Sequence, residues 1–301
     1  MMCLASLCFN LNDTFTKFLA LDYGIAEIIF IRSVIALPLL AAIAVVIGRT
    51  RVRWSSRVFL HAVRGALNLL AAYLYIHGLL YLSIAEATVI LFSSPLIVIL
   101  GAALLFGERV TWRKWAAAIC SFSGVIVAIQ PGAETFSPAS LFILAASCLY
   151  AANSLTARWI PEADNLWTVS FFGALFAALF ISPIAIGEWA PVQAGDLLFF
   201  TAAALCSSLG IGLGALAYRL APAADLAQSS YSGLIWSMGI TWIVWGIIPG
   251  IWTFAGVVVI VGSALFYVIP PRRGGTGNPR QICCGNRKPG FACLRCNSRR
   301  R

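Results

Sequence analysis

Long apolar runs follow one another along most of the chain, each near the length of a membrane-spanning helix. A helix that crosses the hydrocarbon core of a bilayer needs about 20 predominantly apolar residues. The pattern predicts ten such helices, at residues 2–20, 26–47, 59–79, 84–106, 112–130, 139–158, 166–187, 196–216, 223–246 and 251–269. The polar connections are short and no soluble domain is inserted, so the expected fold is an all-α polytopic membrane protein.

The fourth run carries polar residues near its middle. It opens at Glu86, passes Ser93, Ser94 and Pro95, and continues as an apolar segment to Phe106. Irregular backbone at membrane depth is tolerated where protein or a water-filled cavity satisfies its polar groups, and discontinuous helices are common in transport paths. The pattern therefore predicts a broken helix beside a path through the membrane.

Composition supports a lipid environment. Of 301 residues, 60% are hydrophobic and only 11% are charged, whereas soluble domains carry about 25% charged residues. The segment 271–301 differs, because it is basic, Gly-rich and low in apolar residues. We expect it to be a disordered cytoplasmic tail. Its four cysteines are irregularly spaced and have no histidine beside them, so they do not predict a metal site.

The distribution of Lys and Arg predicts the orientation of the chain, because cytoplasmic loops are enriched in both. The basic loop residues are Arg49, Arg51, Arg53, Arg57, Arg109, Arg113 and Lys114, and the loops of the opposite side carry Asp22, Glu134, Glu188 and Asp196. Both termini are therefore expected in the cytoplasm, in a membrane of the bacterial inner or plasma type. The net charge of +10 faces anionic lipid and does not indicate a nucleic-acid partner.

The two halves of the chain resemble each other at a nearly constant offset. Asn12 and Asn153 are 141 residues apart, and Glu86 and Asp225 are 139 residues apart. This offset equals five predicted helices, and an odd number gives the two halves opposite topology, as in transporters built from inverted repeats. The expected inverted five-helix repeats are residues 1–131 and 138–270.

Several short motifs resemble a known family. They are Asn12-Asp13 with Lys17, Phe30-Ile31-Arg32, Arg64-Gly65, the run from Pro95 to Phe106-Gly107-Glu108, Gly124, and Gln130-Pro131. In these residues the chain resembles the drug/metabolite transporter superfamily, specifically its EamA-type members with ten helices, over roughly residues 1–270. The first half is most similar to S-adenosylmethionine uptake transporters, and riboflavin transporters are another similar group. One departure is Ile247, which stands where a Glu is usual after Gly246.

Charged residues inside a bilayer are costly, so each one in the first two predicted helices is a candidate for function. Asp13 and Lys17 are four residues apart and share one helical face. They either neutralise each other, or Asp13 contacts a substrate together with Asn10 and Asn12 while Lys17 lies at the outer mouth of the substrate path. Arg32 either extends to the membrane interface, pairs with Asp13 or Glu86, or binds a carboxylate or phosphate of the substrate.

Glu86 and Asp225 occupy equivalent positions in the expected repeats, each at the start of a helix. The dipole of a helix N-terminus stabilises an acid there, which is a sufficient structural explanation. The competing hypothesis makes the two acids reciprocal gates or proton-coupling groups. Glu108 is expected to neutralise the basic turn that surrounds it.

Polar and aromatic side chains near the middle of the membrane complete the set of candidates. Ser94, Gln228 and Tyr231 lie in the predicted fourth and ninth helices, and Asn153 and Tyr75 lie in the sixth and third. They either line a substrate cavity, whose aromatic rings would suit a planar or cationic metabolite, or pack between helices and at the membrane interface.

Three classes of function were weighed. A membrane enzyme needs a metal-ligand cluster or an activated nucleophile, and the sequence predicts no catalytic residue, metal site or cofactor. A membrane scaffold would not need buried charges. A secondary-active transporter that carries a small organic metabolite by alternating access explains them, and the resemblance implies the same function. The expected partners are a small-molecule substrate and membrane lipid, with proton coupling and the oligomeric state left open.

Overall fold

The computed structural model describes residues 2–46, 49, 52, 55–107, 111–129, 137–156, 159–160, 164–187, 189–220, 232–248 and 250–268. These residues fall within one compact unit, Met1–Val268. The expected tail, residues 271–301, lies outside the described residues, as do Glu108, Asp225, Gln228 and Tyr231.

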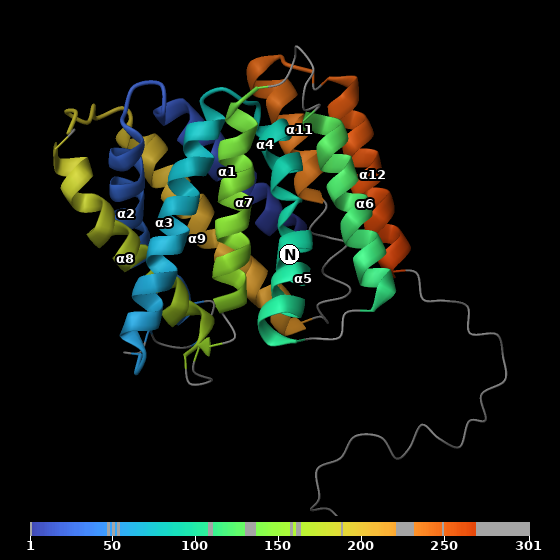
Figure 1. Ribbon diagram of the computed structural model, residues 1–301. Coiled ribbons are helices and arrows are strands. Elements are labelled where there is room, and N and C mark those ends of the chain that lie inside the picture. Colours follow the sequence, from blue (N-terminus) through green and yellow to red (C-terminus); the bar gives the residue numbers. More distant parts are fainter. Residues whose placement is uncertain are drawn as a thin grey trace, which may run out of the picture. The chain divides into compact units, whose positions relative to one another are not determined.

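The described part of the chain forms α-helices and no strands, which confirms the predicted fold class (Figure 1). The helices are α1 (Met2–Leu19), α2 (Ile25–Val46), α3 (Val58–Leu79), α4 (Ile84–Leu91), α5 (Ser94–Phe106), α6 (Trp112–Ile129), α7 (Ala139–Thr156), α8 (Leu166–Gly187), α9 (Leu197–Leu220), α11 (Ser232–Trp245) and α12 (Ile251–Val268). Each predicted span thus coincides with a helix or a pair of helices. The start of the predicted ninth span, residues 223–231, lies outside the described residues.

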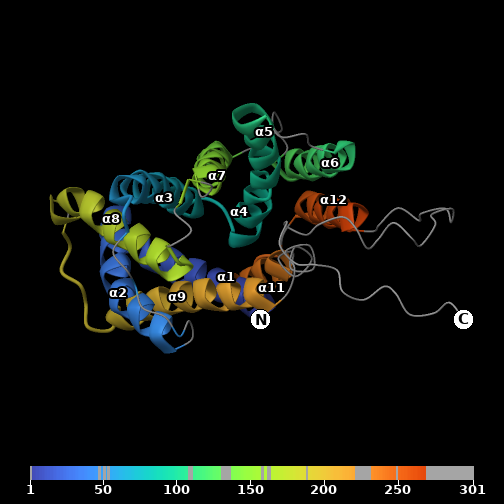
Figure 2. The same cartoon turned by 90° about the horizontal axis from the view of Figure 1, so that it is seen from below.

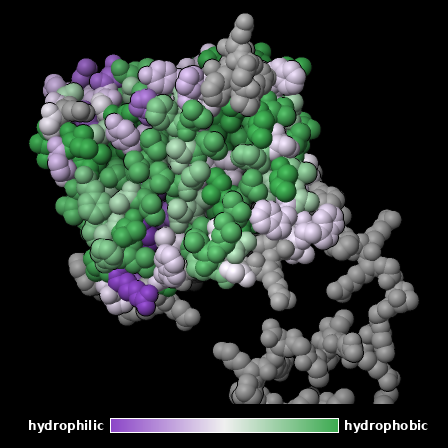
Figure 3. All heavy atoms as spheres, viewed as in Figure 1, coloured by the Kyte–Doolittle hydropathy of each residue, from purple (hydrophilic) through white to green (hydrophobic). Residues whose placement is uncertain are grey.

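Five of the described spans are long and apolar enough to cross a membrane by length and composition: Ile25–Val46, Val58–Leu79, Ile84–Phe106, Ala139–Thr156 and Leu166–Gly187. Large apolar side chains face outward on these spans and on other helices: Phe59 of α3 is 82% exposed, and Ile243 of α11 and Val258 of α12 are 76% and 70% exposed. Apolar residues cover most of the middle of the face shown in Figure 3, and the most hydrophilic residues lie toward its edges. These exposed apolar side chains are therefore expected to contact lipid.

The predicted fourth span is broken, as its polar middle indicates. Helix α4 ends at Leu91, Phe92 and Ser93 form a turn, and α5 begins at Ser94. Pro95 has no backbone N–H and is tolerated only in the first turn of a helix, which is where it lies in α5. The Ser93 hydroxyl lies 2.8 Å from the Ser147 hydroxyl of α7. The buried hydroxyl of Ser93, at the break, therefore has its hydrogen-bond partner on a neighbouring helix.

Helices of the first half pair with helices of the second half. Helix α2 packs on α8, α4 on α11, and α6 on α12, while α1 packs on α9 and α3 on α7 (Figure 2). If α7 to α12 repeat α1 to α6, then α2 with α8 and α6 with α12 join equivalent helices, and the last two pairs are equivalent to each other. Helix α4 with α11 joins parts of the equivalent fourth and ninth spans, in which α11 corresponds to α5. This pairing is what a two-fold relation between the halves would produce. The inverted repeat itself remains a prediction, which the pairing supports.

Individual contacts fix the relative directions of some helices. Arg64, near the start of α3, bonds to Asn153, near the end of α7, so α3 and α7 run in opposite directions. Ser121 and Ser263 bond across α6 and α12, and Gly124 follows Ser121 by one turn while meeting Gly256, two turns earlier in α12. These two helices are therefore also antiparallel, as helices separated by five spans must be.

Candidate functional site

A cavity of about 560 Å³ lies among seven of the described helices, α1, α2, α3, α4, α7, α8 and α9, of which α4 contributes Leu91. Helices of both halves contribute to its wall. Polar side chains from several helices line the wall. They are Asn12, Asp13, Thr16, Arg32, Ser33, Arg64, Asn68, Tyr75, Tyr150, Asn153, Ser170, Ser207 and Ser208. Pockets of roughly 300–1,000 Å³ hold small molecules and cofactors, so the cavity has the size of a metabolite site.

One side of the cavity is a hydrogen-bond network centred on Asp13. One oxygen of its carboxylate accepts a bond from the Tyr75 hydroxyl at 2.9 Å, and the other accepts from the Asn12 amide at 3.0 Å. The Asn12 oxygen in turn accepts from Arg32 Nη1 at 3.3 Å, and the same nitrogen lies 3.4 Å from the Thr16 hydroxyl. Asp13 and Arg32 are thus linked through the neutral amide of Asn12, and Arg32 extends into the protein rather than to the interface.

A second polar group lies on α3 and α7. Arg64 Nη1 donates to the main-chain oxygen of Asn153 at 2.6 Å and to the Thr156 hydroxyl at 2.8 Å. The side-chain oxygen of Asn153 is buried without a hydrogen-bond partner among the described residues. An unpaired buried acceptor costs about 1–3 kcal/mol, so this oxygen is ready to accept a bond from a donor in the cavity.

Eight polar residues of the wall were not predicted as site residues from the sequence, and Asn68 and Tyr150 are two of them. Asn68 follows Arg64 by four residues and precedes Tyr75 by seven, so the three lie along one face of α3. Tyr150 precedes Asn153 by three residues and shares a face of α7 with it. This helical spacing was the available signal, because polar residues repeated at intervals of three, four or seven mark the inner face of an apolar helix.

Five predicted site residues line the cavity: Asn12, Asp13, Arg32, Tyr75 and Asn153. Lys17 does not, because its Nζ donates to the main-chain oxygen of Leu82 and lies 5.4 Å from the centre of the Trp245 ring. It forms no ion pair with Asp13. Ser94 also lies away from the cavity wall, at the start of α5.

Glu86 lies at the N-terminus of α4, where it forms a capping box with Ser83. The carboxylate accepts bonds from the Ser83 main-chain nitrogen and hydroxyl, both at 2.9 Å, and the Ser83 hydroxyl accepts from the Glu86 main-chain nitrogen at 3.2 Å. The sequence Ser-x-x-Glu is the signature of this motif. Glu86 contacts a small separate pocket beside Ser137 and Ser140 and not the large cavity.

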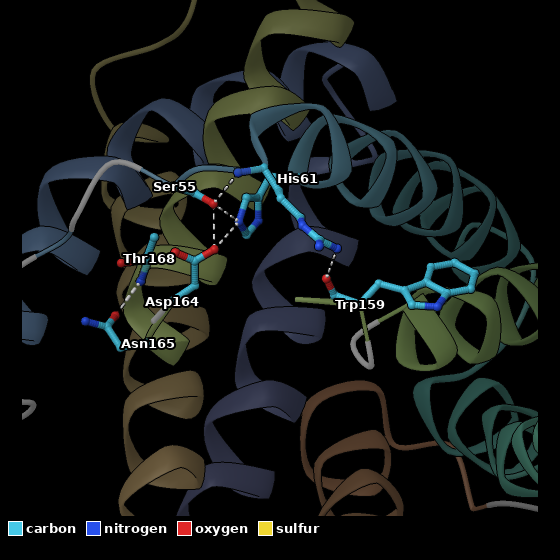
Figure 4. Close-up of polar contacts among 7 residues, drawn as sticks. Ser55, His61, Trp159, Asp164, Asn165 and Thr168 are labelled. Atoms are coloured by element: carbon cyan, nitrogen blue, oxygen red, sulfur yellow. Dashed lines mark hydrogen bonds and ion pairs between the residues drawn. The ribbon is translucent and has the colours of Figure 1, made fainter. Parts of the chain in front are cut away.

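A third polar cluster joins the start of α3 to the segment before α8 (Figure 4). Asp164 Oδ2 accepts from the Ser55 hydroxyl at 2.5 Å and lies 3.0 Å from His61 Nε2. His61 is 1% exposed and stacks on Phe172. Asn165, next in the chain, caps α8 by accepting from the Thr168 main-chain nitrogen at 2.8 Å. The sequence did not predict this link between the two halves.

The Ser55, His61 and Asp164 side chains are not arranged as a catalytic triad. In a triad the imidazole uses one nitrogen for the serine and the other for the acid. Here the same nitrogen, Nε2, lies 3.0 Å from both the Ser55 and Asp164 oxygens. The stacked Phe172 ring and the burial of His61 leave no room for a substrate beside it. The cluster therefore holds two segments together. Among the described residues, no group of three or more acids, histidines and cysteines could hold a metal ion.

A polytopic helical protein with a charged cavity among its helices has the architecture of a small-molecule transporter. Residues 1–130 match the EamA-like transporter family. The predicted resemblance is therefore confirmed over residues 1–130, which match the model of the EamA-like transporter family. Together with the apolar helices, this match indicates an integral, multi-pass membrane protein.

Curated transporters match most of the chain. An S-adenosylmethionine uptake transporter of Rickettsia bellii is 25% identical, covering 87% of this chain and 90% of that protein. A riboflavin transporter of Rhizobium johnstonii is 27% identical over 88% of each chain. A pseudopaline exporter of Pseudomonas aeruginosa is 25% identical, with 87% and 92% covered. The matches extend well beyond residue 130, so the second half also resembles these transporters.

A solved crystal structure shares the fold. It superposes with a TM-score of 0.59 at 18% sequence identity, covering 88% of this chain and 98% of the other. At this identity the likeness concerns the arrangement of helices and carries nothing about the substrate.

Proposed function

We propose that the protein is a secondary-active transporter that carries a small organic metabolite across the membrane by alternating access. The observation that carries the proposal is the cavity of about 560 Å³, walled by helices of both halves and lined by Asp13, Arg32 and Arg64. Charged groups inside a membrane protein are costly and mark substrate or ion paths. A scaffold would gain nothing from them, and no catalytic function is needed to explain them.

The expected motion is a rocking of residues 1–131 against residues 138–270 around the cavity. The pairing of α2 with α8 and of α6 with α12 supports this division, because each pair joins the two expected repeats. In transporters with inverted repeats the substrate site lies at the repeat interface near the bilayer midplane. We propose that both termini lie in the cytoplasm, which the distribution of basic loops supports, and that the membrane is of the bacterial inner or plasma type.

The relatives suggest three candidate substrates. The first is an S-adenosylmethionine-like compound, since several curated relatives bear that name. The second is riboflavin, because one relative is a riboflavin transporter. The third is a metabolite similar to pseudopaline, because another relative is a pseudopaline exporter. Amino acids and drugs complete the panel, because the superfamily resemblance implies such substrates. Energy coupling is proposed to come from a proton gradient.

A transport assay with purified protein in proteoliposomes tests the proposal. Labelled S-adenosylmethionine and riboflavin, followed by amino acids, are offered with and without an imposed proton gradient. Uptake above that of protein-free vesicles supports transport, and dependence on the gradient supports coupling. A protein that binds none of the panel and moves none of it contradicts the proposed substrate classes.

Gly173 provides a variant that blocks the cavity without disturbing the helices. It lies in the cavity wall, and a Cβ built on it meets no atom within 4 Å. Gly173→Phe should therefore fill the cavity, leave folding intact and abolish uptake. The matched control is Gly262→Phe in α12, because Gly262 is exposed, has the same open space around its Cβ and lies away from the cavity. Equal uptake by the two variants would place the path elsewhere.

A further inference from the structure

We propose that the cavity selects substrates by charge: it favours a metabolite that carries a carboxylate or another anionic group and disfavours one with a net positive charge. The proposal rests on the proposed function and adds the substrate class. It does not follow from the relatives, whose names cover chemically different substrates.

The wall of the cavity carries a net positive charge. Among the described residues of the wall, the charged side chains are Asp13, Arg32 and Arg64. Arginine stays protonated in proteins, so these residues contribute a net charge of at least +1 whether Asp13 is ionised or neutral. A like charge that enters a poorly solvated cavity is repelled more strongly than in water.

The guanidinium groups of Arg32 and Arg64 form hydrogen bonds to neutral partners. Arg32 bonds to Asn12 and Thr16, and Arg64 bonds to a main-chain oxygen and a hydroxyl. All of these partners are neutral. Among the described residues the ion pair found is that of His61 with Asp164, at another place. Both arginines use Nη1 for these bonds. Within the part of the chain that the structure describes, the rest of each planar fork is therefore left for a bidentate anion.

Asn153, in the same wall, provides a hydrogen-bond acceptor that has no partner among the described residues. The Asn153 side-chain oxygen is buried without a partner among the described residues, and its own main-chain oxygen is bonded to Arg64. A substrate with an N–H or O–H donor near its anionic group would satisfy both residues together. Carboxylates with a nearby amine fit this description, as do phosphate esters with a nearby hydroxyl.

Charged thiol reagents measure the potential of the cavity without knowledge of the substrate. Gly173→Cys puts a thiol on the wall in open space. Its rates of modification by anionic sulfonatoethyl and cationic trimethylammonioethyl methanethiosulfonate are read by peptide mass spectrometry. Each rate is divided by that of 2-mercaptoethanol, which removes the intrinsic difference between the reagents. Gly195→Cys, in an exposed loop with equally open space, is the matched control.

We expect the normalised preference for the anionic over the cationic reagent to be about a hundredfold greater at position 173 than at 195. One unit charge about 10 Å away at an effective dielectric near 20 changes each rate by about tenfold, in opposite directions for the two reagents. Arg64→Gln should lower this preference, Arg64→Lys should retain it, and Asp13→Asn, which removes no positive charge, should not lower it. An equal or cationic preference at position 173 overturns the proposal, as does a thiol that reacts with neither reagent.

Binding of matched ligand pairs tests selection itself. S-adenosylmethionine and S-adenosylhomocysteine differ by one methyl group and one positive charge, and riboflavin and its 5′-phosphate differ by a phosphate. We expect the less positive member of each pair to stabilise the purified protein more in a thermal-shift assay, with the difference reduced in Arg64→Gln. Tighter binding of S-adenosylmethionine overturns the charge rule while leaving transport intact. If no pair binds, the reagent rates still decide the charge of the cavity, and proteoliposome uptake decides the function.

Discussion

Gly107 and Gly246 end two helices in the same left-handed conformation, with φ of 62° and 66°. They follow Phe106 at the end of α5 and Trp245 at the end of α11, and they lie 139 residues apart, the offset that relates the predicted repeats. A left-handed residue after a helix satisfies its last carbonyl groups, and glycine adopts this conformation without the strain of a Cβ. Equivalent positions in the two halves therefore share an unusual backbone conformation.

Alanine at either glycine should destabilise the protein. No atom lies within 4 Å of a Cβ built on Gly107 or Gly246, so the cost comes from the backbone alone, about 1–2 kcal/mol per residue. We expect Gly107→Ala and Gly246→Ala each to lower the melting temperature of the purified protein in detergent. Gly239→Ala, inside α11 with the same open space and no positive φ, is the control and should leave the melting temperature unchanged or higher. Equal melting temperatures for all three variants would contradict this explanation.

Gly124 and Gly256 have the opposite requirement, because space and not backbone conformation needs them. A Cβ on Gly124 would lie 2.8 Å from the Gly256 carbonyl oxygen, and one on Gly256 would lie 2.6 Å from the Gly124 oxygen. Small residues let membrane helices approach closely, and α6 and α12 pack mainly on each other. Gly124→Ala and Gly256→Ala should each cost about 1–3 kcal/mol by overpacking.

The measurement for this pair is unfolding in detergent by circular dichroism. Gly262→Ala, on the exposed side of α12, should be neutral. The double variant tests the shared contact: because either substitution alone already separates the helices, the two losses should not add. Full additivity would mean that the two glycines act independently.

Sequence reasoning predicted the spans well because an apolar run of about 20 residues has few alternatives in a membrane. The break before Ser94 was also visible, because Pro95 restricts the preceding turn. The residues of the site were harder to predict. The spacing of Asn68 and Tyr150 from other polar residues indicates the inner faces of α3 and α7, but which residues of a face line a cavity depends on the neighbouring helices, so both were missed. The direction taken by the long side chain of Lys17, toward Leu82, depends on a tertiary contact that no local pattern contains.

The link between His61 and Asp164 should contribute to stability. His61 is 1% exposed and its Nε2 lies 3.0 Å from the Asp164 carboxylate, so removing either group leaves the other buried with the Ser55 hydroxyl as its remaining partner in the cluster. Asp164→Asn and His61→Phe should each destabilise the protein by about 1–3 kcal/mol. Because the two residues act together, the double variant should lose less than the sum of the single losses. A thermal-unfolding cycle of the four proteins measures the coupling, and a coupling of zero would show that the contact is energetically neutral.

Substitution of Glu86 by Gln distinguishes a structural role of the carboxylate from a role in proton coupling. A capping box accepts Gln as well as Glu, so Glu86→Gln should keep the hydrogen bonds to Ser83 and the stability of α4. Ser83→Ala should instead lose about 1 kcal/mol, because the hydroxyl that caps the helix is removed. If Glu86 only caps α4, then Glu86→Gln transports as well as the unchanged protein, with the same response to a proton gradient. If uptake by Glu86→Gln no longer responds to the gradient while the melting temperature is retained, the carboxylate is part of the coupling path. We expect the first result, because Glu86 lies outside the wall of the cavity and both partners in its cap are neutral.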